Sequence, residues 1–472
     1  MPATRARAET ALSERPERAY RTRYHATWVL PITSPPIVNG TVVVEGDRIA
    51  WVGPRERAPD GRDVELGESL LLPGLVNAHT HLDLTAMRGV LHGMPFFAWV
   101  RALVALREEL TAAELLDSAR LGILEGLRAG ITTYADTAPN EAPFEAMREL
   151  GVRGIAYREV FGPDPARCED AMGDLRATVT ALRARETPLA RVGVSPHAPY
   201  SVSDALFRAA AGLARREGLP LATHVGESDD ESRLVERGEG EFAAFLRDRG
   251  LAVGARARSP IALLEQCEVL ARNTLLIHCV RCDAMDVATI ARHRASVAHC
   301  PASNAWFGHG IAPVGELLAA GVRVGLGTDS MASNERMGLL DEARRALTEQ
   351  RARGRAECDA RTVLELATIA GARSLALERE VGSLERGKQA DLAAFPLPRG
   401  GARARDPDDA LVAALAGARA SLVVVAGRVL VRDGHTLAPD DGCADRVTAV
   451  TTRLSASRRA VAARWRPPPP FH

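Results

Sequence analysis

The sequence of 472 residues contains a single lysine, Lys388, and no excess of either charge. Its 60 Lys and Arg residues balance its 60 Asp and Glu residues, so the formal net charge is zero. Proteins that bind nucleic acid or anionic membranes through bulk electrostatics carry a basic excess. We therefore expect neither partner and predict a small-molecule substrate.

The chain also lacks a long uninterrupted apolar run. Residues 1–23 mix arginine with glutamate, contain no apolar core of a secretion signal, and predict a flexible N-terminal arm. The most apolar late stretch, ALVAALAGARASLVVVAGRVL, is interrupted by Arg419 and Arg428. It therefore predicts a helix followed by a strand, with no membrane span.

The seven cysteines show no disulfide framework. Their odd number and irregular spacing are typical of reduced thiols, so we expect a cytoplasmic protein. Cys279 and Cys282 form a CxxC pair, but no second pair exists to complete a zinc knuckle. A redox or zinc role for this pair is a minor alternative.

Short β-rich runs lie near both ends of the chain. VVVEGDRIAWVG predicts a hairpin, and GSLERGKQADLAAF and ASLVVVAGRVLVRDGH have the same character. We predict that residues 24–70 and 376–440 form one small composite β-sandwich domain. Residues 441–472 end in the basic, proline-rich stretch SASRRAVAARWRPPPPFH, which predicts a mobile C-terminal tail.

Residues 71–375 alternate short apolar strands with helical segments. The candidate strands are LLLPGLVNAH, ITTYAD, GIAYREV, RVGVSPH, PLATHV, TLLIHC, ASVAHC and VRVGLGTD. Eight strands alternating with helices over this length predict a (β/α)₈ TIM barrel. A doubly wound open sheet is the alternative.

Most of these strands end on a polar side chain. His79 and His81 follow the first strand, and because residues two apart on a strand share a face, their imidazoles should converge. The other polar ends are His197, His224, His278 and Asp329. In a barrel the carboxyl ends of the strands meet on one face, where the chemistry takes place.

This set predicts a metal centre. His79, His81, His224 and Asp329 supply three nitrogens and one carboxylate, which suit one divalent metal, Zn²⁺ or Fe²⁺, with room for a water. Such a metal lowers the pKa of its water to about 7. Glu227, three residues after His224, is our candidate general acid/base, and a solvated loop glutamate is the alternative.

PGLVNAHTHL, SPHAPYS, THVGES, LLIHCV, VAHCPASNAWFGHGIAPVGELLAAGVRVGLGTDS and GSLERGKQADLAAF occur in one order across residues 40–430. On these motifs the chain resembles the amidohydrolase superfamily, in its chlorohydrolase and nucleoside deaminase branch. The resemblance implies metal ligation by His79, His81, His224 and Asp329, proton transfer by Glu227, and a water oriented by His278 and Asp329. It implies hydrolytic deamination of an aminated heterocycle, and it leaves a homo-oligomer open.

The substrate is less defined. The resemblance places His197 and Glu108, or Glu109, at a ribose or purine. HCVR, with Arg281, stands where nucleoside deaminases read HCVH, and other stretches are similar to aminodeoxyfutalosine deaminases of menaquinone biosynthesis. In that case Arg281 or Arg158 would meet the benzoate of the substrate. The alternatives are methylthioadenosine, S-adenosylhomocysteine, adenosine or guanine deamination, a triazine-type hydrolase, and a catalytically inactive scaffold.

Overall fold

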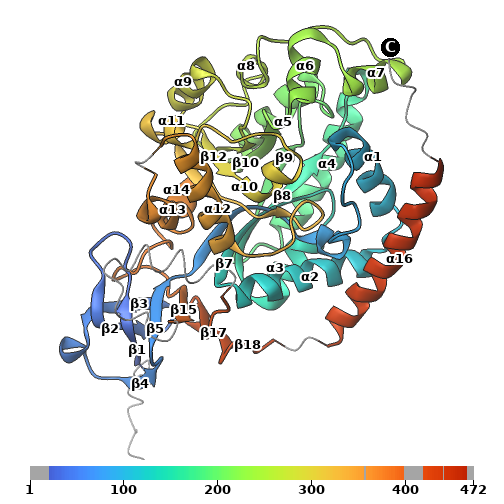
Figure 1. The fold of residues 1–472 in the computed structure, drawn as a ribbon. Coiled ribbons are helices and arrows are strands. Elements are labelled where there is room, and N and C mark those ends of the chain that lie inside the picture. The colour runs from blue at the N-terminus through green and yellow to red at the C-terminus, as the bar shows by residue number, and fades with distance from the viewer. Residues whose placement is uncertain (1–20, 356–357, 398–417, 439–440, 465–472) are drawn as a thin grey trace, which may run out of the picture.

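The computed structural model describes residues 21–355, 358–397, 418–438 and 441–464. Within them, a parallel sheet curls around the centre of the larger unit, and a second sheet forms a smaller unit at its side (Figure 1). The first 20 residues of the predicted arm lie outside the described residues, and the chain is already in a strand at Arg21, before the predicted boundary at residue 24.

The barrel sheet has the order β13-β12-β11-β10-β9-β8-β7-β6-β14. Its strands are β6 (Leu75–His81), β7 (Ile131–Ala138), β8 (Arg153–Val160), β9 (Ala190–Pro196), β10 (Leu221–Val225), β11 (Thr274–His278), β12 (Ser296–His299), β13 (Arg323–Leu326) and β14 (Asp329–Ser330). β13 and β14 are two parts of the eighth strand, since only Gly327 and Thr328 separate them. β13 pairs with β12 and β14 pairs with β6, so the sheet closes on itself. The predicted barrel is confirmed, and the open sheet is wrong.

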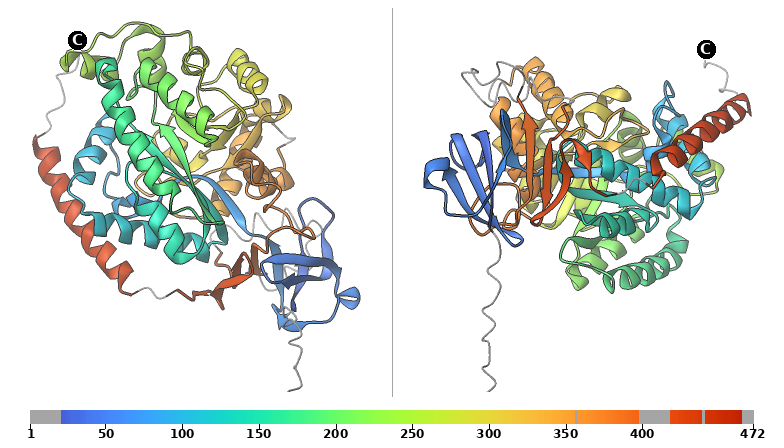
Figure 2. Two further views of the ribbon diagram at one scale, coloured as in Figure 1. Left: turned by 180° about the vertical axis from the view of Figure 1, so that it is seen from behind. Right: turned by 90° about the horizontal axis from the view of Figure 1, so that it is seen from below.

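Helices follow the barrel strands and cover the outside of the sheet (Figures 1 and 2). They are α1 (Phe96–Arg107), α2 (Ala112–Arg128), α3 (Ala142–Leu150), α4 (Cys168–Arg183), α5 (Asp204–Glu217), α6 (Asp229–Arg237), α7 (Glu241–Asp248), α8 (Pro260–Gln266), α9 (Ala284–His293), α10 (Pro301–Trp306), α11 (Val314–Ala319), α12 (Leu339–Ala352), α13 (Ala360–Leu366) and α14 (Ile369–Ser374). The described part of the chain also has three short 3₁₀ helices, η1 (Arg55–Arg57), η2 (Leu82–Met87) and η3 (Pro165–Arg167). Local chemistry sets the ends: Ser203 caps α5 through the Leu206 amide, and Gly218, at a φ of 64°, ends it.

The second sheet combines strands from both ends of the chain, in the order β18-β17-β16-β15-β5-β1-β2-β3, with β4 beside β1. The N-terminal strands are β1 (Arg21–Val29), β2 (Ile37–Glu45), β3 (Arg48–Pro54), β4 (Arg62–Glu65) and β5 (Ser69–Pro73), and the C-terminal ones are β15 (Leu392–Pro396), β16 (Leu422–Val425), β17 (Arg428–Arg432) and β18 (His435–Thr436). β15 pairs antiparallel with β5 and joins the two sets. The composite β-domain predicted from the flanks is confirmed.

The stretch LLLPGLVNAH is not one barrel strand, as the sequence suggested. Its first half is β5 of the outer sheet, its second half is β6 of the barrel, and the chain crosses between them at Gly74. A Cβ at Gly74 would lie 2.2 Å from Thr132 Oγ1, so only glycine fits there. A buried ion pair also joins the two units, because Arg153 on β8 bonds Asp391 at 3.0 and 3.1 Å.

Residues 443–464, expected as part of a mobile tail, instead form a helix, α16 (Cys443–Arg464). It lies along the outside of the barrel beside α1 and α2 (Figures 1 and 2). Cys443, Val447, Val450 and Leu454 are buried against that surface. Residues 465–472 lie outside the described residues. No helix in the described parts of the chain combines the length and the apolar character that a bilayer crossing needs.

Candidate active site

His79, His81, His224 and Asp329 converge near the carboxyl ends of β6 and β10 and at the first residue of β14. His79 Nε2 lies 3.2 Å from Asp329 Oδ1, His81 Nε2 lies 3.3 Å from His224 Nε2, and His81 Nε2 lies 3.6 Å from Asp329 Oδ1. The pairing of β14 with β6 sets this geometry, because it places Asp329 opposite Thr80, between the two histidines of β6. All four side chains are largely shielded from solvent.

The donor set fits a divalent cation. Burial lowers the pKa of His79, brings that of His81 to about 4, and lowers that of His224 well below its usual value, so all three imidazoles are neutral at pH 7. Two neutral Nε2 atoms at 3.3 Å share at most one hydrogen. Zn–N bonds of about 2.0–2.1 Å in a tetrahedron separate neighbouring ligand atoms by about 3.3 Å. Burial would raise the pKa of Asp329, but the surrounding imidazoles hold it well below its ordinary range, so the carboxylate is charged.

Hydrogen bonds from neighbouring residues hold the candidate metal ligands in one orientation. His224 Nδ1 donates to the carbonyl of His197 at 3.1 Å, which leaves Nε2 free to coordinate. Thr137 Oγ1 lies 3.3 Å from His81 Nδ1. Thr80 Oγ1 donates to the Asp329 carbonyl at 3.2 Å and ties β14 to β6. This set of contacts is typical of a metal site whose ligands are held in one orientation.

His278 and Glu227 lie on the open side of this cluster. His278 Nε2 is 3.7 Å from Glu227 Oε1 and 4.0 Å from Asp329 Oδ2. His278 Nδ1 bonds Asn304 Oδ1 at 3.0 Å, so Nε2 faces the site. Burial, followed by the charges of Asp329 and Glu231, raises the pKa of Glu227 well above its usual value. A raised pKa makes a carboxyl a better proton donor near neutral pH, which suits general acid/base chemistry.

Backbone strain occurs at the same residues. His278 and Asp329 have φ values of 76° and 55°, in the left-handed region that non-glycine residues rarely adopt. Such strain costs about 1–3 kcal/mol per residue and persists where surrounding structure enforces it. His278 is the last residue of β11 and Asp329 is the first residue of β14. At these two positions the strained backbone turns both side chains toward the cluster.

A cavity of about 510 Å³ opens above the cluster. Its floor includes His81, His224, Glu227, His278 and Asp329. Its walls are largely aromatic and come from α1, α7 and the loops after β8, β9 and α10. The aromatic residues that line it are Phe96, Phe97, Trp99, Phe161, Tyr200, Phe242, Phe245 and Phe307. The size and lining are those of a small-molecule site with a few polar groups at one end.

The predicted substrate-binding residues divide into two groups. His197 and Glu108 line the cavity, His197 near the metal cluster and Glu108 exposed at the end of α1. Arg158 and Arg281 are not among its lining residues. Arg158 precedes Glu159 on β8, and since Glu159 faces the cavity, Arg158 points to the other side of the sheet. Arg281 forms an ion pair with Asp229 at 3.0 Å.

Four polar residues of the site were missed in the sequence. Glu159 is buried, has an unpartnered Oε1 within the described residues, and lies 4.0 Å from His197 Nε2; burial raises its pKa to about 8. His309 Nε2 lies 3.7 Å from Glu227 Oε1. Asn304 orients His278, and Arg107 lines the cavity. Only Glu159 carried a signal, as an acidic residue near the end of an apolar strand.

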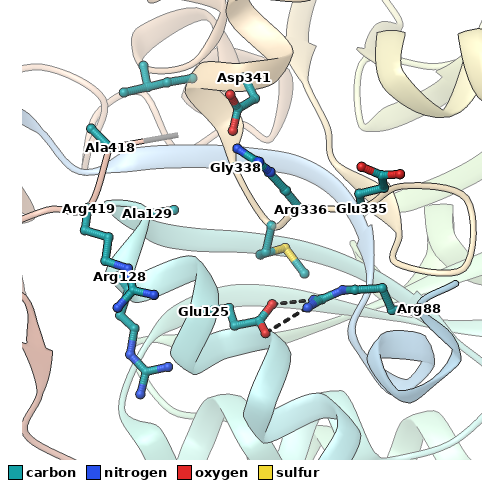
Figure 3. Close-up of a pocket in the computed structure, with 12 residues that line it drawn as sticks. Arg88, Glu125, Arg128, Ala129, Glu335, Arg336, Gly338, Asp341, Ala418 and Arg419 are labelled. Atoms are coloured by element: carbon teal, nitrogen blue, oxygen red, sulfur yellow. Dashed lines mark hydrogen bonds and ion pairs between the residues drawn. The ribbon is translucent and has the colours of Figure 1, made fainter. Parts of the chain in front are cut away.

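A second cavity, of about 310 Å³, is lined by Arg88, Glu125, Arg128 and Arg336 together with Ala418 and Arg419 (Figure 3). Arg88 and Glu125 are ion-paired across it. None of the predicted site residues lines this cavity, and it contains no histidine.

Comparison with known proteins agrees with this geometry. The amidohydrolase family matches residues 70–430. A 5-methylthioadenosine/S-adenosylhomocysteine deaminase of Moorella thermoacetica is 31% identical over 421 residues, 86% of this chain and 93% of the relative. A zinc-bound adenosine deaminase of Xanthomonas campestris superposes with a TM-score of 0.81 at 26% identity and covers 94% of this chain and 100% of that structure.

The chain belongs to the amidohydrolase family. Family membership and deaminase relatives confirm the predicted enzyme class, a hydrolase that acts on a carbon–nitrogen bond. An aminofutalosine deaminase of Helicobacter pylori has a TM-score of 0.76 at 21% identity, covering 87% of this chain and 100% of that structure. At that identity the likeness concerns the fold alone.

Proposed function

We propose that this protein is a metal-dependent deaminase that hydrolyses the exocyclic amine of an adenine nucleoside. One observation carries the proposal: Glu227, with a raised pKa, lies beside His278 and Asp329 at the floor of an aromatic cavity, next to a set of donors that fits a divalent cation. The deaminase named among the relatives supports the same chemistry.

The proposed ligands are His79, His81, His224 and Asp329, and the bound metal would supply a water that is acidic enough to act as a nucleophile at neutral pH. Zn²⁺ and Fe²⁺ both suit three imidazoles and a carboxylate. We propose one such ion per chain. Metal analysis of protein purified without added metal would identify it.

In the proposed mechanism, Glu227 transfers the protons, and His278 and Asp329 orient the attacking water. Glu227 protonates the ring nitrogen next to the carbon that carries the amine, then takes a proton from the hydroxyl group added to that carbon and passes it to the amine, which leaves as ammonia. His278, whose Nδ1 is bound to Asn304, presents Nε2 to the attacking water and orients it together with Asp329. If His278 also stabilises an oxyanion, Nε2 has to carry a proton at that step.

The aromatic walls suit a purine, because a flat base packs well between rings. His197 and Glu159 are 4.0 Å apart beside the metal cluster, at a depth where a sugar hydroxyl would reach them. Glu108, exposed at the end of α1, is further toward solvent. We therefore propose His197 as the first contact of the sugar and keep Glu108 as a residue of the cavity entrance.

Aminodeoxyfutalosine, an intermediate of menaquinone biosynthesis, remains our candidate substrate on the basis of sequence motifs, with methylthioadenosine, S-adenosylhomocysteine and adenosine as alternatives. We further propose a cytoplasmic enzyme, because the odd number and irregular spacing of the seven cysteines are typical of reduced thiols. A homo-oligomer remains a prediction from the family resemblance.

Turnover of a substrate panel tests the proposal. Metal-loaded protein would be incubated with the four nucleosides above, guanine and a chlorotriazine, and release of ammonia and chloride would be measured. We expect ammonia from at least one adenine nucleoside. Chloride release alone would support a triazine-type hydrolase and contradict the proposal.

A further inference from the structure

The carboxyl group of Glu227 lies between two imidazole rings. Glu227 Oε1 is 3.7 Å from His278 Nε2 and 3.7 Å from His309 Nε2. His278 also approaches Asp329 and lines the substrate cavity, whereas His309 is not among the residues that line it. His309 therefore lies behind Glu227, on the side away from the substrate, and the mechanism described so far gives it no role.

The end of helix α10 sets the position of His309. The amide of His309 donates to the carbonyl of Asn304 at 2.9 Å, and the amide of Gly308 donates to the carbonyl of Ala305 at 3.1 Å. With Gly308 at a φ of 67°, these two bonds form a Schellman motif, which turns the chain back beside the helix. The side chain of Asn304 bonds His278 Nδ1. One residue of α10 therefore holds both imidazoles in place, one through its carbonyl and one through its amide group.

Two phenylalanines of the cavity wall fix the His309 ring. Phe307 stacks on it with the ring centres 5.1 Å apart and the planes at 28°, and Phe96 of α1 meets it edge to face at 4.7 Å and 89°. Both phenylalanines line the substrate cavity. His309 is only 6% exposed, so its ring has little freedom to turn away from Glu227.

The Nε2 atom of His309 is buried and has no hydrogen-bond partner among the described residues. Burial lowers the pKa of His309 to about 3, so the ring is neutral at pH 7 and carries a single hydrogen. A buried polar atom without a partner is destabilising, and such atoms are rare outside functional sites. A bridging water does not fill the gap to Glu227 at 3.7 Å, because two atoms joined by one water lie about 4.5–5.5 Å apart.

We propose that His309 is a positioning residue for Glu227, in which Nε2 carries the ring hydrogen and donates it to Glu227 Oε1 when substrate binds. This inference rests on the proposed function and adds a residue to its proton relay. Catalytic hydrogen bonds are often long before substrate binds and shorten in the complex. A shift of about 0.8 Å would bring the two atoms to about 2.9 Å, the usual length of such a bond.

The donated hydrogen bond serves the moment at which Glu227 has given up its proton. It stabilises the carboxylate and fixes Oε1, so that Oε2 is left to face the reacting atoms. A neutral imidazole suits this task better than a cation, because a positive charge in contact with the carboxylate would oppose uptake of the next proton.

Three variants separate hydrogen bonding from packing. His309→Phe keeps a flat ring against Phe96 and Phe307 but has no donor, and His309→Gln keeps an N–H donor at about the position of Nε2. The control is His92→Phe, which changes an exposed histidine that packs edge to face on Trp306 of the same helix. Unfolding temperature and metal content would be compared first, so that only folded, metal-loaded variants are used.

The measured quantities are kcat and KM for an adenine nucleoside that the parent deaminates. His309→Phe should lower kcat by about 10- to 100-fold with KM nearly unchanged, the effect of losing one hydrogen bond to a charged group. His309→Gln should recover most of the loss, and His92→Phe should match the parent. In a Glu227→Gln background, His309→Phe should lower the residual rate no further. Parental kcat in His309→Phe, or equal losses in His309→Phe and His309→Gln, would overturn the inference.

A measurement without turnover separates this inference from the proposed function. In zinc-loaded protein with ¹⁵N-labelled histidine, long-range ¹H–¹⁵N spectra distinguish a hydrogen on Nε2 from one on Nδ1, and the signals of His309 are those absent from His309→Gln. We expect a hydrogen on Nε2 and a nitrogen resonance that shifts in Glu227→Gln but not in His92→Phe. A hydrogen on Nδ1 would overturn the inference even if nucleosides are deaminated. If none is deaminated while the Nε2 signal responds to Glu227→Gln, the proposed function fails and the pairing of His309 with Glu227 stands.

Discussion

Glu227→Gln should abolish turnover while leaving the protein as stable as its parent, or more so. The amide keeps the shape of the side chain, and no hydrogen bond is lost, because within the described residues the Glu227 carboxyl makes only the 3.7 Å approaches to His278 and His309. What disappears is the proton relay. General acid/base groups contribute about 100- to 10,000-fold, so kcat should fall by this factor, or about 3–5 kcal/mol in activation free energy.

The stability of the variant follows from the raised pKa of Glu227. An unfolded glutamate has a pKa of about 4.3, and burial raises the pKa of Glu227 well above that in the folded state. Between these two values the folded state binds more protons, so this residue lowers the free energy of unfolding as pH rises. Glutamine lacks this effect, and the variant should therefore gain stability relative to the parent between pH 5 and pH 8.

The assays are ammonia release under saturating substrate, metal content, and urea unfolding of the metal-free proteins at pH 5 and pH 8. The reasoning would be refuted if Glu227→Gln retained more than about a tenth of parental kcat. It would also be refuted if the variant lost metal or stability in proportion to activity, because Glu227 would then be a structural residue.

Three further changes test other parts of the structure. His224→Ala should reduce bound divalent metal from one equivalent to a small fraction and abolish turnover, and metal analysis showing full retention would exclude it as a ligand. Asn304→Ala removes the partner of His278 Nδ1 and should lower kcat by about 10- to 100-fold with metal retained, whereas an unchanged kcat would mean that the ring needs no such support. Arg153→Met leaves Asp391 buried without its cation, and urea unfolding should show a loss of about 3–5 kcal/mol; a loss below about 1 kcal/mol would show that the pair is not needed.

The sequence was sufficient for the barrel and for the positions of the metal-binding candidates, for a physical reason. A parallel strand buried on both faces appears as a short apolar run, and a polar residue at its carboxyl end has to lie on one face of the barrel. His79 and His81 share a side of β6 because their spacing matches the period of a strand. The order of the strands in the sheet was not needed to predict that His79 and His81 lie close to His224.

Other features depended on contacts that the sequence does not display. Arg158 and Glu159 are neighbours at the end of β8, and only the position of the strand in the barrel decides which one faces the cavity. Arg281 has the charge to meet a carboxylate but is neutralised by Asp229.

The sequence of helix α16 contains the spacing of an amphipathic helix, but its polar average composition concealed that pattern. Cys443, Val447, Val450 and Leu454 are spaced by four, three and four residues, which is the spacing of one helical face. The surrounding alanines, threonines and arginines gave the segment a polar average, and the adjacent prolines favoured a tail. The apolar face is narrow, yet it is buried against the barrel.

The most direct test of the account is deamination in ¹⁸O-labelled water, followed by mass spectrometry of the purine product. Metal-loaded protein should convert an adenine nucleoside to its hypoxanthine form with one ¹⁸O atom and one ammonia per turnover, and Glu227→Gln or prior removal of the metal should suppress both. An intact adenine base after incubation of fully metal-loaded protein with every nucleoside of the panel, or ammonia release without ¹⁸O in the product, would contradict hydrolytic deamination at this site.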